Sequence, residues 1–181
     1  MMLPGFSHRV RRMSLHPQAQ TFLKQLAQLD RPPWHKMPVD VGRQLFSSST
    51  ALFGDGPSLS EVVDEVWEGV AVRRYRPSDE AHHPLLYFHG GGWVIGDLDT
   101  HDSLCRRLAQ ATDRVVIAVD YRRAPEHKYP AALDDCYTAA QYLSQHADML
   151  RVDASQLVVL GDSAGGNLAA GVSLRSRDEQ G

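Results

Sequence analysis

The sequence has few cysteines, no long apolar run and no excess of positive charge. Cys105 and Cys136 are its two cysteines, and each lies in a helix-like stretch. Zinc sites need more ligands at closer spacing, so we expect two buried, reduced thiols. No apolar run approaches the roughly 18 residues that a membrane-spanning helix needs. The net charge of −3 argues against a nucleic-acid or anionic-membrane surface.

The amino-terminal stretch lacks the apolar centre of a secretory signal. Residues 1–12 are basic and aperiodic, without the roughly 7–15 apolar residues that such a signal carries. Met13 is a plausible start, so we expect residues 1–13 to be a tail. Together these absences predict a cytoplasmic protein with no membrane and no nucleic-acid partner.

Two helices are expected in the next stretch. In "MSLHPQAQTFLKQLAQLDRPP", Pro17 suits a first helical turn, and apolar residues recur at helical spacing up to Leu29. The "PP" pair then ends the helix. A weaker helical pattern covers about residues 38–46, and "SSST" and "GDGPS" are typical of loops. We expect residues 14–60 to form cap or lid helices.

Short apolar runs alternate with helix-like segments in residues 61–181. Runs bounded by polar residues or glycine suit strands that are buried on both faces. Strands that alternate with helices imply a mainly parallel sheet covered on both sides. The expected strands are 61–66, 70–77, 84–88, 114–119 and 156–160, and the expected helices are about 99–112, 130–147 and 164–177.

The stretch "GDSAGG" has the pattern of a serine nucleophile on a tight turn. Gly161, Ser163 and Gly165 form G-x-S-x-G between an expected strand and an expected helix. Small residues flank the serine because a β-carbon there would clash. The turn lifts the Ser163 hydroxyl above the sheet, and the helix N-terminus favours developing negative charge. A chance match has a probability of roughly 6%, which the strand–turn–helix context lowers.

The stretch "HGGGW", residues 89–93, follows the strand "LLYF" directly. Three successive glycines let backbone N–H groups point into a site, as the oxyanion of a tetrahedral intermediate requires. The alternatives are a flexible loop or a phosphate cradle. A cradle fits poorly, because neither glycine run satisfies G-x-G-x-x-G and neither is followed by Gly-Lys-Ser/Thr.

These motifs make the chain resemble the hormone-sensitive-lipase-like carboxylesterases of the α/β-hydrolase superfamily. "HGGGW", "GDSAGGN" and, between them, "DYRRAPEHKYPAALDD" (120–135) carry the resemblance, which covers about residues 14–177. Arg123 departs from it, because the family usually has an apolar residue there. The resemblance implies a three-layer α/β sandwich with a mostly parallel sheet, incomplete at its C-terminal side, and N-terminal cap helices. It also implies hydrolysis of short- to medium-chain acyl esters with neither cofactor nor metal.

The family's catalytic residues carry over position by position. Ser163 matches the nucleophile, and Gly91, Gly92 and the backbone N–H of Ala164 match the oxyanion hole. The resemblance therefore implies attack by the serine on an ester carbonyl and an acyl-enzyme intermediate.

Three further residues match supporting positions of the family. Gly90 completes the glycine loop, and His89 shapes that loop without being the catalytic base. For Asp162, directly before the nucleophile, we expect a structural role.

No histidine follows Ser163 in this sequence. In α/β-hydrolases the triad runs Ser, Asp/Glu, His along the chain. Residues 164–181 contain Asp178 and Glu179, but all nine histidines precede the serine. We therefore expect a truncated form that lacks the triad acid and histidine.

An upstream histidine is a weak substitute for the missing base. His89 and His127 lie in loops that can approach the serine, but geometry rather than presence makes a triad. A metal at the adjacent pair His82-His83 has still less support, because such pairs are usually solvated.

Three interpretations remain open. The chain is a serine carboxylesterase in truncated form, a ligand-binding module, or a non-functional fragment; gibberellin receptors resemble the same family and lack a working triad. The expected partner is a small ester, with amides and lactones left open because the same nucleophile serves all acyl transfer. Strand 156–160 would have a bare apolar edge, so we also expect self-association or marginal stability.

Overall fold

The computed structural model describes residues 14–29 and 32–180, and these divide into two compact units, residues 1–37 and 38–181. The predicted tail, residues 1–13, lies outside the described residues. In the first unit, helix α1 (Pro17–Gln28) begins at Pro17 as predicted, and a short 3-10 helix, η1 (Trp34–Lys36), follows.

The second unit begins with helix α2 (Val39–Ser49) and a 3-10 helix, η2 (Thr50–Phe53). The prediction that "SSST" forms a loop is therefore wrong. The serines continue the helix, and the hydroxyls of Ser48 and Ser49 donate to backbone carbonyls three residues earlier, as Ser49 does to Phe46 at 2.6 Å. "GDGPS" is a loop, as predicted.

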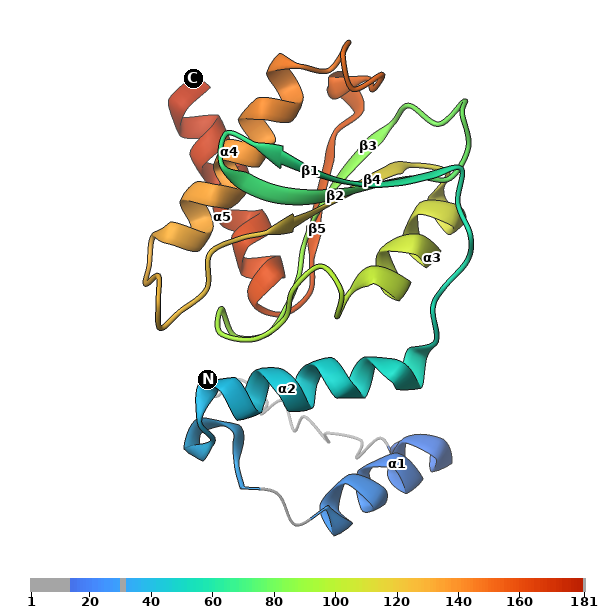
Figure 1. Cartoon of the computed structure of the whole chain (residues 1–181), viewed down its shortest axis with the longest axis vertical. Helices are drawn as coiled ribbons and strands as arrows, with labels where there is room; N and C mark the ends of the chain where they lie inside the picture. The colour runs from blue at the N-terminus through green and yellow to red at the C-terminus, as the bar shows by residue number, and fades with distance from the viewer. Residues whose placement is uncertain (1–13, 30–31, 181) are drawn as a thin grey trace, which may run out of the picture. The chain divides into compact units, whose positions relative to one another are not determined.

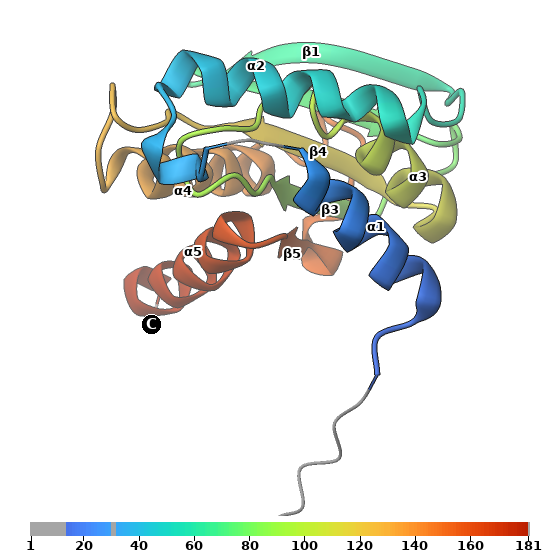
Figure 2. The same cartoon turned by 90° about the horizontal axis from the view of Figure 1, so that it is seen from below.

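Five strands form a mixed sheet in the order β1-β2-β4-β3-β5. The strands β1 and β2 form a hairpin, β2 pairs antiparallel with β4, and β4, β3 and β5 run parallel. Figure 2 shows β1 and β5 at opposite sides of this sheet. The strand bounds are β1 (Glu61–Trp67), β2 (Val70–Arg76), β3 (Pro84–Phe88), β4 (Val115–Asp120) and β5 (Val158–Gly161).

Helices cover both faces of the sheet, so the predicted three-layer α/β sandwich is confirmed (Figure 1). Helices α4 (Ala131–Gln145) and α5 (Ala164–Gln180) pack on one face, and α3 (Asp102–Thr112) packs on the other. Cys136 is buried where α4 and α5 pack on the sheet, and Cys105 is buried where α3 packs on the other face. Both thiols are free, as predicted.

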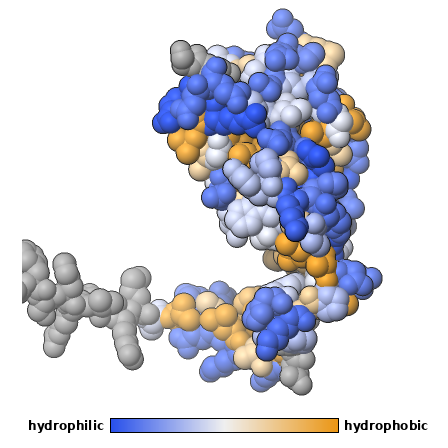
Figure 3. Space-filling view, turned by 90° about the vertical axis from the view of Figure 1, so that its left-hand side faces the viewer, coloured by the Kyte–Doolittle hydropathy of each residue, from blue (hydrophilic) through white to orange (hydrophobic). Residues whose placement is uncertain are grey.

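The outer side of α4 and α5 is mainly hydrophilic, with separate apolar patches (Figure 3). Leu174 of α5 is one exposed apolar residue of this layer. None of the described helices is both long and apolar enough to cross a membrane.

Two element starts differ from the predicted ones for local reasons. Helix α3 begins at Asp102 rather than near residue 99, because Asp97 and Thr100 close a turn before it. The Thr100 N–H donates to the Asp97 carboxylate at 2.9 Å, and the Asp97 N–H donates to the Thr100 hydroxyl at 2.8 Å. Strand β5 begins at Val158 because the 3-10 helix η3 (Ala154–Gln156) occupies the preceding residues.

The edge strand β5 is apolar and partly exposed. Val158 and Leu160 point to the same face and are each 39% exposed, whereas Val159 packs against the core of the opposite face. Among the described residues, β5 pairs with β3 alone.

The packing of the core predicts that two helical leucines contribute very differently to the free energy of unfolding. Leu143 of α4 is fully buried against the sheet, whereas Leu104 of α3 is 46% exposed. Leu143→Ala should lower the free energy of unfolding by about 2–5 kcal/mol, and Leu104→Ala by less than about 0.5 kcal/mol. Urea unfolding of the two variants measures this difference, and equal losses would contradict the layer assignment.

Candidate active site

Ser163 lies on the tight turn that joins β5 to α5, and its side chain is exposed. Its backbone has φ +50°, a left-handed conformation that costs a non-glycine residue about 1–3 kcal/mol. The N–H of Gly165 closes the turn on the carbonyl of Asp162 at 2.7 Å. The predicted nucleophile therefore has the strained strand–turn–helix setting that its motif requires.

The glycines of G-x-S-x-G are needed because α5 approaches the end of β3 closely. A β-carbon on Gly165 would overlap the backbone carbonyl of Phe88, the last residue of β3, and one on Gly161 would meet the same carbonyl oxygen at 2.6 Å. Any larger residue at either position would push the helix away from the sheet.

Asp162 joins the turn that carries the serine to the glycine loop. Its Oδ1 accepts the backbone N–H of Gly90 at 2.9 Å and the hydroxyl of Tyr87 at 2.6 Å. Asp162 thus has the structural role expected of it, because it fixes the start of the glycine loop relative to Ser163.

Three backbone N–H groups of the glycine loop and the serine turn have no acceptor among the described residues. Gly91 and Gly92 have φ values of +125° and +60°, and Gly91 accepts bonds from Val94 and Ile95 through its carbonyl. Within the described part of the chain, the N–H groups of Gly91, Gly92 and Ala164 donate to no acceptor. Ala164 is also the first residue of α5, where the helix dipole favours negative charge.

His89 is buried beneath the glycine loop and stacks on Tyr121, with ring centroids 4.2 Å apart. Its Nδ1 lies 2.8 Å from the Gly90 carbonyl, which can only accept, so Nδ1 carries the proton. The Tyr121 hydroxyl donates to the His89 carbonyl at 2.7 Å. Burial lowers the pKa of His89 to about 4, so the ring is neutral near pH 7.

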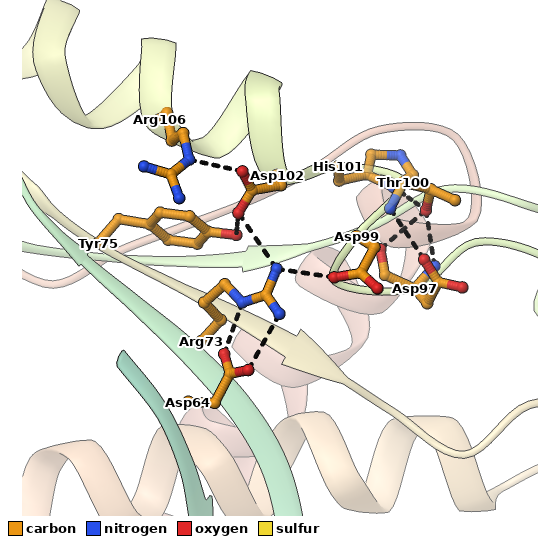
Figure 4. Close-up of polar contacts among 9 residues, drawn as sticks. All are labelled: Asp64, Arg73, Tyr75, Asp97, Asp99, Thr100, His101, Asp102 and Arg106. Atoms are coloured by element: carbon orange, nitrogen blue, oxygen red, sulfur yellow. Dashed lines mark hydrogen bonds and ion pairs between the residues drawn. The ribbon is translucent and has the colours of Figure 1, made fainter. Parts of the chain in front are cut away.

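An arginine on β2 fixes the loop that leads into α3 (Figure 4). The Arg73 guanidinium donates to Asp64, to Asp99 at 2.9 Å and to Asp102 at 3.2 Å. Only 17% of the Arg73 side chain is exposed, so these contacts are partly shielded from solvent. This network holds the segment that carries His101.

His101 is a buried residue of the site that motif analysis did not single out. Its Nε2 lies 3.7 Å from the Asp162 carboxylate, and its ring centroid lies 5.4 Å from that of His89. Burial lowers the pKa of His101, which keeps the ring neutral near pH 7. In the sequence His101 belongs to the stretch "GDLDTHD", residues 96–102, whose pattern does not predict the contact with Asp162. Arg123, the departure from the family pattern, donates to the carbonyl of Gly96, the first residue of this stretch.

No candidate base lies within hydrogen-bond distance of the serine. Among residues 14–29 and 32–180, no side chain donates to the Ser163 hydroxyl or accepts from it. His89 is buried with its Nδ1 bonded, and His127 lies on an exposed loop beside a cavity. Within the described residues, neither of these two upstream histidines is hydrogen-bonded to Ser163.

Two cavities lie beside these elements. One, of about 420 Å³, is bounded by Gly92 and Trp93, by Leu133 of α4 and by Leu168 of α5. The other, of about 910 Å³, lies between η2 and the start of α3. The smaller cavity therefore borders the glycine loop directly.

The buried His89 predicts a loss of stability in acid. In the unfolded chain the His89 ring has a pKa near 6.5 and becomes protonated below that pH. In the folded chain the ring stays neutral down to about pH 4. His89 therefore does not affect the free energy of unfolding above about pH 6.5. As the pH drops toward 4, protonation of the unfolded ring lowers this free energy by roughly 3 kcal/mol in all. NMR titration of the His89 Cε1–H should give a midpoint near 4. A midpoint near 6.5 would contradict the burial argument, and His101, whose pKa is also lowered, serves as the internal comparison.

Known proteins with this fold show where the chain belongs. A model of the α/β-hydrolase fold matches residues 85–181, more than half of the chain. The chain is 41% identical over 172 residues to "Ethyl acetate hydrolase" of Pseudomonas putida, covering 87% of this chain and 54% of that protein. "Esterase LipI" of Mycobacterium tuberculosis is 46% identical over 125 residues, covering 65% of this chain and 39% of that protein.

Solved structures agree with these relatives. The hyperthermophilic esterase of the archaeon Pyrobaculum calidifontis superposes with a TM-score of 0.86 and 42% identity, covering 93% of this chain and 56% of that one. The chain thus spans about half the length of the relatives that it matches. From its motifs, its fold and these matches, the chain belongs to the hormone-sensitive-lipase-like carboxylesterases of the α/β-hydrolase fold.

Proposed function

We propose that the protein is a serine carboxylesterase that hydrolyses short- to medium-chain acyl esters through an acyl-enzyme. The observation that carries the proposal is the pairing of a strained, exposed Ser163 with three unpartnered backbone N–H groups, those of Gly91, Gly92 and Ala164. Donors fixed before the reaction stabilise an oxyanion without reorganising, which is the main source of rate in acyl transfer.

In this mechanism the Ser163 Oγ attacks the carbonyl carbon of the ester and loses its proton to a base. The carbonyl oxygen takes up the electron pair and is held by the N–H groups of Gly91, Gly92 and Ala164. The intermediate collapses, the C–O bond to the alcohol breaks, and the alcohol leaves with a proton. Water then attacks the acyl-serine by the same steps, which releases the carboxylic acid and restores the hydroxyl.

The proposal places the base and its acid outside residues 1–181. The chain covers 54% and 56% of two of its relatives, and the described residues bring no histidine within hydrogen-bond distance of Ser163. Without a base the serine is a weak nucleophile. Oxyanion stabilisation and binding alone would leave an acceleration of about 10³–10⁴ over water.

The cavity of about 420 Å³ supports an ester with an apolar part of modest size. Its walls include Trp93, Leu133 and Leu168, and it borders Gly92, whose N–H is a proposed oxyanion donor. Ligand pockets of about 300–1,000 Å³ suit small molecules, so the cavity can take an acyl chain or an alcohol group.

Acylation of Ser163 tests this function. With p-nitrophenyl butyrate, the 181-residue chain should form a slow butyryl adduct, detectable by mass spectrometry of the intact protein. Ser163→Ala should abolish the adduct, because no other serine in the described ranges has a left-handed backbone and adjacent free N–H donors. Ser173→Ala, a change of an exposed serine on the same helix, should leave it unchanged.

The possible outcomes separate the interpretations. An adduct that persists in Ser163→Ala would contradict the esterase proposal. Rapid turnover that depends on Ser163 would show that a base lies within residues 1–181. Saturable binding of butyrate without any adduct would favour the ligand-binding module.

We also propose that the chain self-associates through β5. The other edge strand, β1, carries three carboxylates, whereas β5 has none and exposes Val158 and Leu160. Charged side chains on an edge strand oppose pairing with a second copy, and an apolar edge permits it.

Light scattering coupled to size exclusion tests this association. The mass should rise with concentration above the 20.1 kDa of one chain. Leu160→Lys should restore the mass of one chain by placing a charge on the β5 edge. Val66→Lys, at a more exposed position on β1, is the matched control and should change nothing. A single-chain mass at every concentration would contradict the proposal.

A further inference from the structure

Arg43 of α2 binds two loops of the core at once. Its Nε donates to the Val94 carbonyl at 2.9 Å, and its Nη2 donates to the Ala124 carbonyl at 3.1 Å. Nη1 and Nη2 also donate to the two carboxylate oxygens of Glu126, each at 2.8 Å. Four of the five N–H donors of a guanidinium are therefore used, and 28% of the side chain is exposed.

The acceptors of Arg43 adjoin the glycine loop. The N–H groups of Val94 and Ile95 both donate to the Gly91 carbonyl, which makes residues 91–95 one closed turn. The N–H of Ala124 donates to the Trp93 carbonyl at 2.8 Å. Two successive carbonyls, those of Trp93 and Val94, are thus held from outside the turn. The bond to the Val94 carbonyl comes from Arg43 of α2, a helix that is distant in sequence.

This turn needs outside support because its backbone is strained. Gly91 and Gly92 have positive φ values at little cost, but Trp93 also has φ +60°. A bulky residue in that conformation costs about 1–3 kcal/mol and persists only where its surroundings fix it. The Trp93 side chain is 41% exposed, so packing fixes it only in part. The hydrogen bonds to the carbonyls of residues 93 and 94 supply the rest of the support for this strained backbone.

Glu126 orients Arg43 for this task. A carboxylate that accepts two parallel bonds from one guanidinium fixes the plane of the group. The bond to Arg43 holds the pKa of Glu126 at about 2, so the pair is charged throughout the neutral range. A lysine has no fork, so it can reach one acceptor but cannot span the carbonyls and the carboxylate together.

We propose that Arg43 is a positioning residue for the oxyanion loop: it fixes the turn 91–95 so that the N–H groups of Gly91 and Gly92 stay in the positions that the proposed oxyanion hole requires. The role of that loop rests on the proposed esterase function. Helix α2 thereby contributes to the reaction through one guanidinium group and without contact between Arg43 and the substrate.

NMR of the loop amides tests the positioning directly. The variants are Arg43→Met, which keeps the aliphatic stem, and Arg43→Lys, which keeps the charge. The control is Arg74→Met, because Arg74 also binds carboxylates, on β1, far from the loop in the sheet order. In ¹H–¹⁵N spectra, the Gly91 and Gly92 amides should shift or split in both Arg43 variants and stay in place in the control.

Acylation kinetics give the second measurement. Loss of one oxyanion donor costs about 10²–10³ in rate, so misdirected donors in Arg43→Met should slow the acylation of Ser163 by about 10- to 100-fold with little change in the half-saturating ester concentration. Added methylguanidine should restore part of the rate in Arg43→Met, and Arg43→Lys should stay impaired. A residue needed only for folding would show neither rescue nor this kinetic pattern.

The outcomes separate this inference from the proposed function. Unmoved Gly91 and Gly92 amides in Arg43→Met overturn the inference, whatever the acylation rate. Moved amides support the placement of the loop by Arg43 even if no ester acylates Ser163, a result that would count against the esterase proposal alone. If Arg43→Met does not fold, the spectra of Arg43→Lys decide.

Discussion

The close contact between the turn after β5 and the end of β3 is the constraint on which the site depends. Gly161 and Gly165 let this turn lie against the Phe88 carbonyl, and the Asp162 carboxylate then reaches the N–H of Gly90. The serine, the start of α5 and the glycine loop thus share one rigid frame. Because adjacent parallel strands end at the same edge of a sheet, β3 and β5 bring these segments together without a long connection.

The strain at this edge is balanced by the core and by a few polar contacts. Ser163 and Trp93 both have left-handed backbones, each at a cost of about 1–3 kcal/mol. The turn at Ser163 packs against the end of β3, whose residues are all buried, so the backbone around Ser163 is held rigidly. Trp93 lies in the loop after β3 and is 41% exposed, so hydrogen bonds to the carbonyls of Trp93 and Val94 add to the support that packing gives it. The two strained residues are therefore stabilised by different means.

The sequence predicted those parts of the molecule that local physics determines. The glycines around Ser163 follow from steric limits within one turn, and the alternation of strands and helices follows from apolar runs that are each contiguous. It could not predict Arg43, whose acceptors Val94 and Ala124 are 51 and 81 residues away. His101 was missed for the same reason, since only the fold places it beside Asp162. The helical serines after residue 46 were misread because serine favours both loops and helix ends.

The described groups around Ser163 are suited to stabilising negative charge and poorly suited to accepting a proton. The N–H groups of Gly91, Gly92 and Ala164 donate only, and burial keeps His89 and His101 neutral near pH 7 with their rings packed under the loop. All of these come from the β3 side of β5 or from the start of α5. Within the described residues, these elements therefore offer Ser163 hydrogen-bond donors and no proton acceptor, whereas β5 pairs with no strand other than β3 and exposes Val158 and Leu160. Because Ser163 directly follows the end of β5, whatever pairs with the free edge of this strand also comes close to the serine, so that sheet pairing and the surroundings of Ser163 are physically linked.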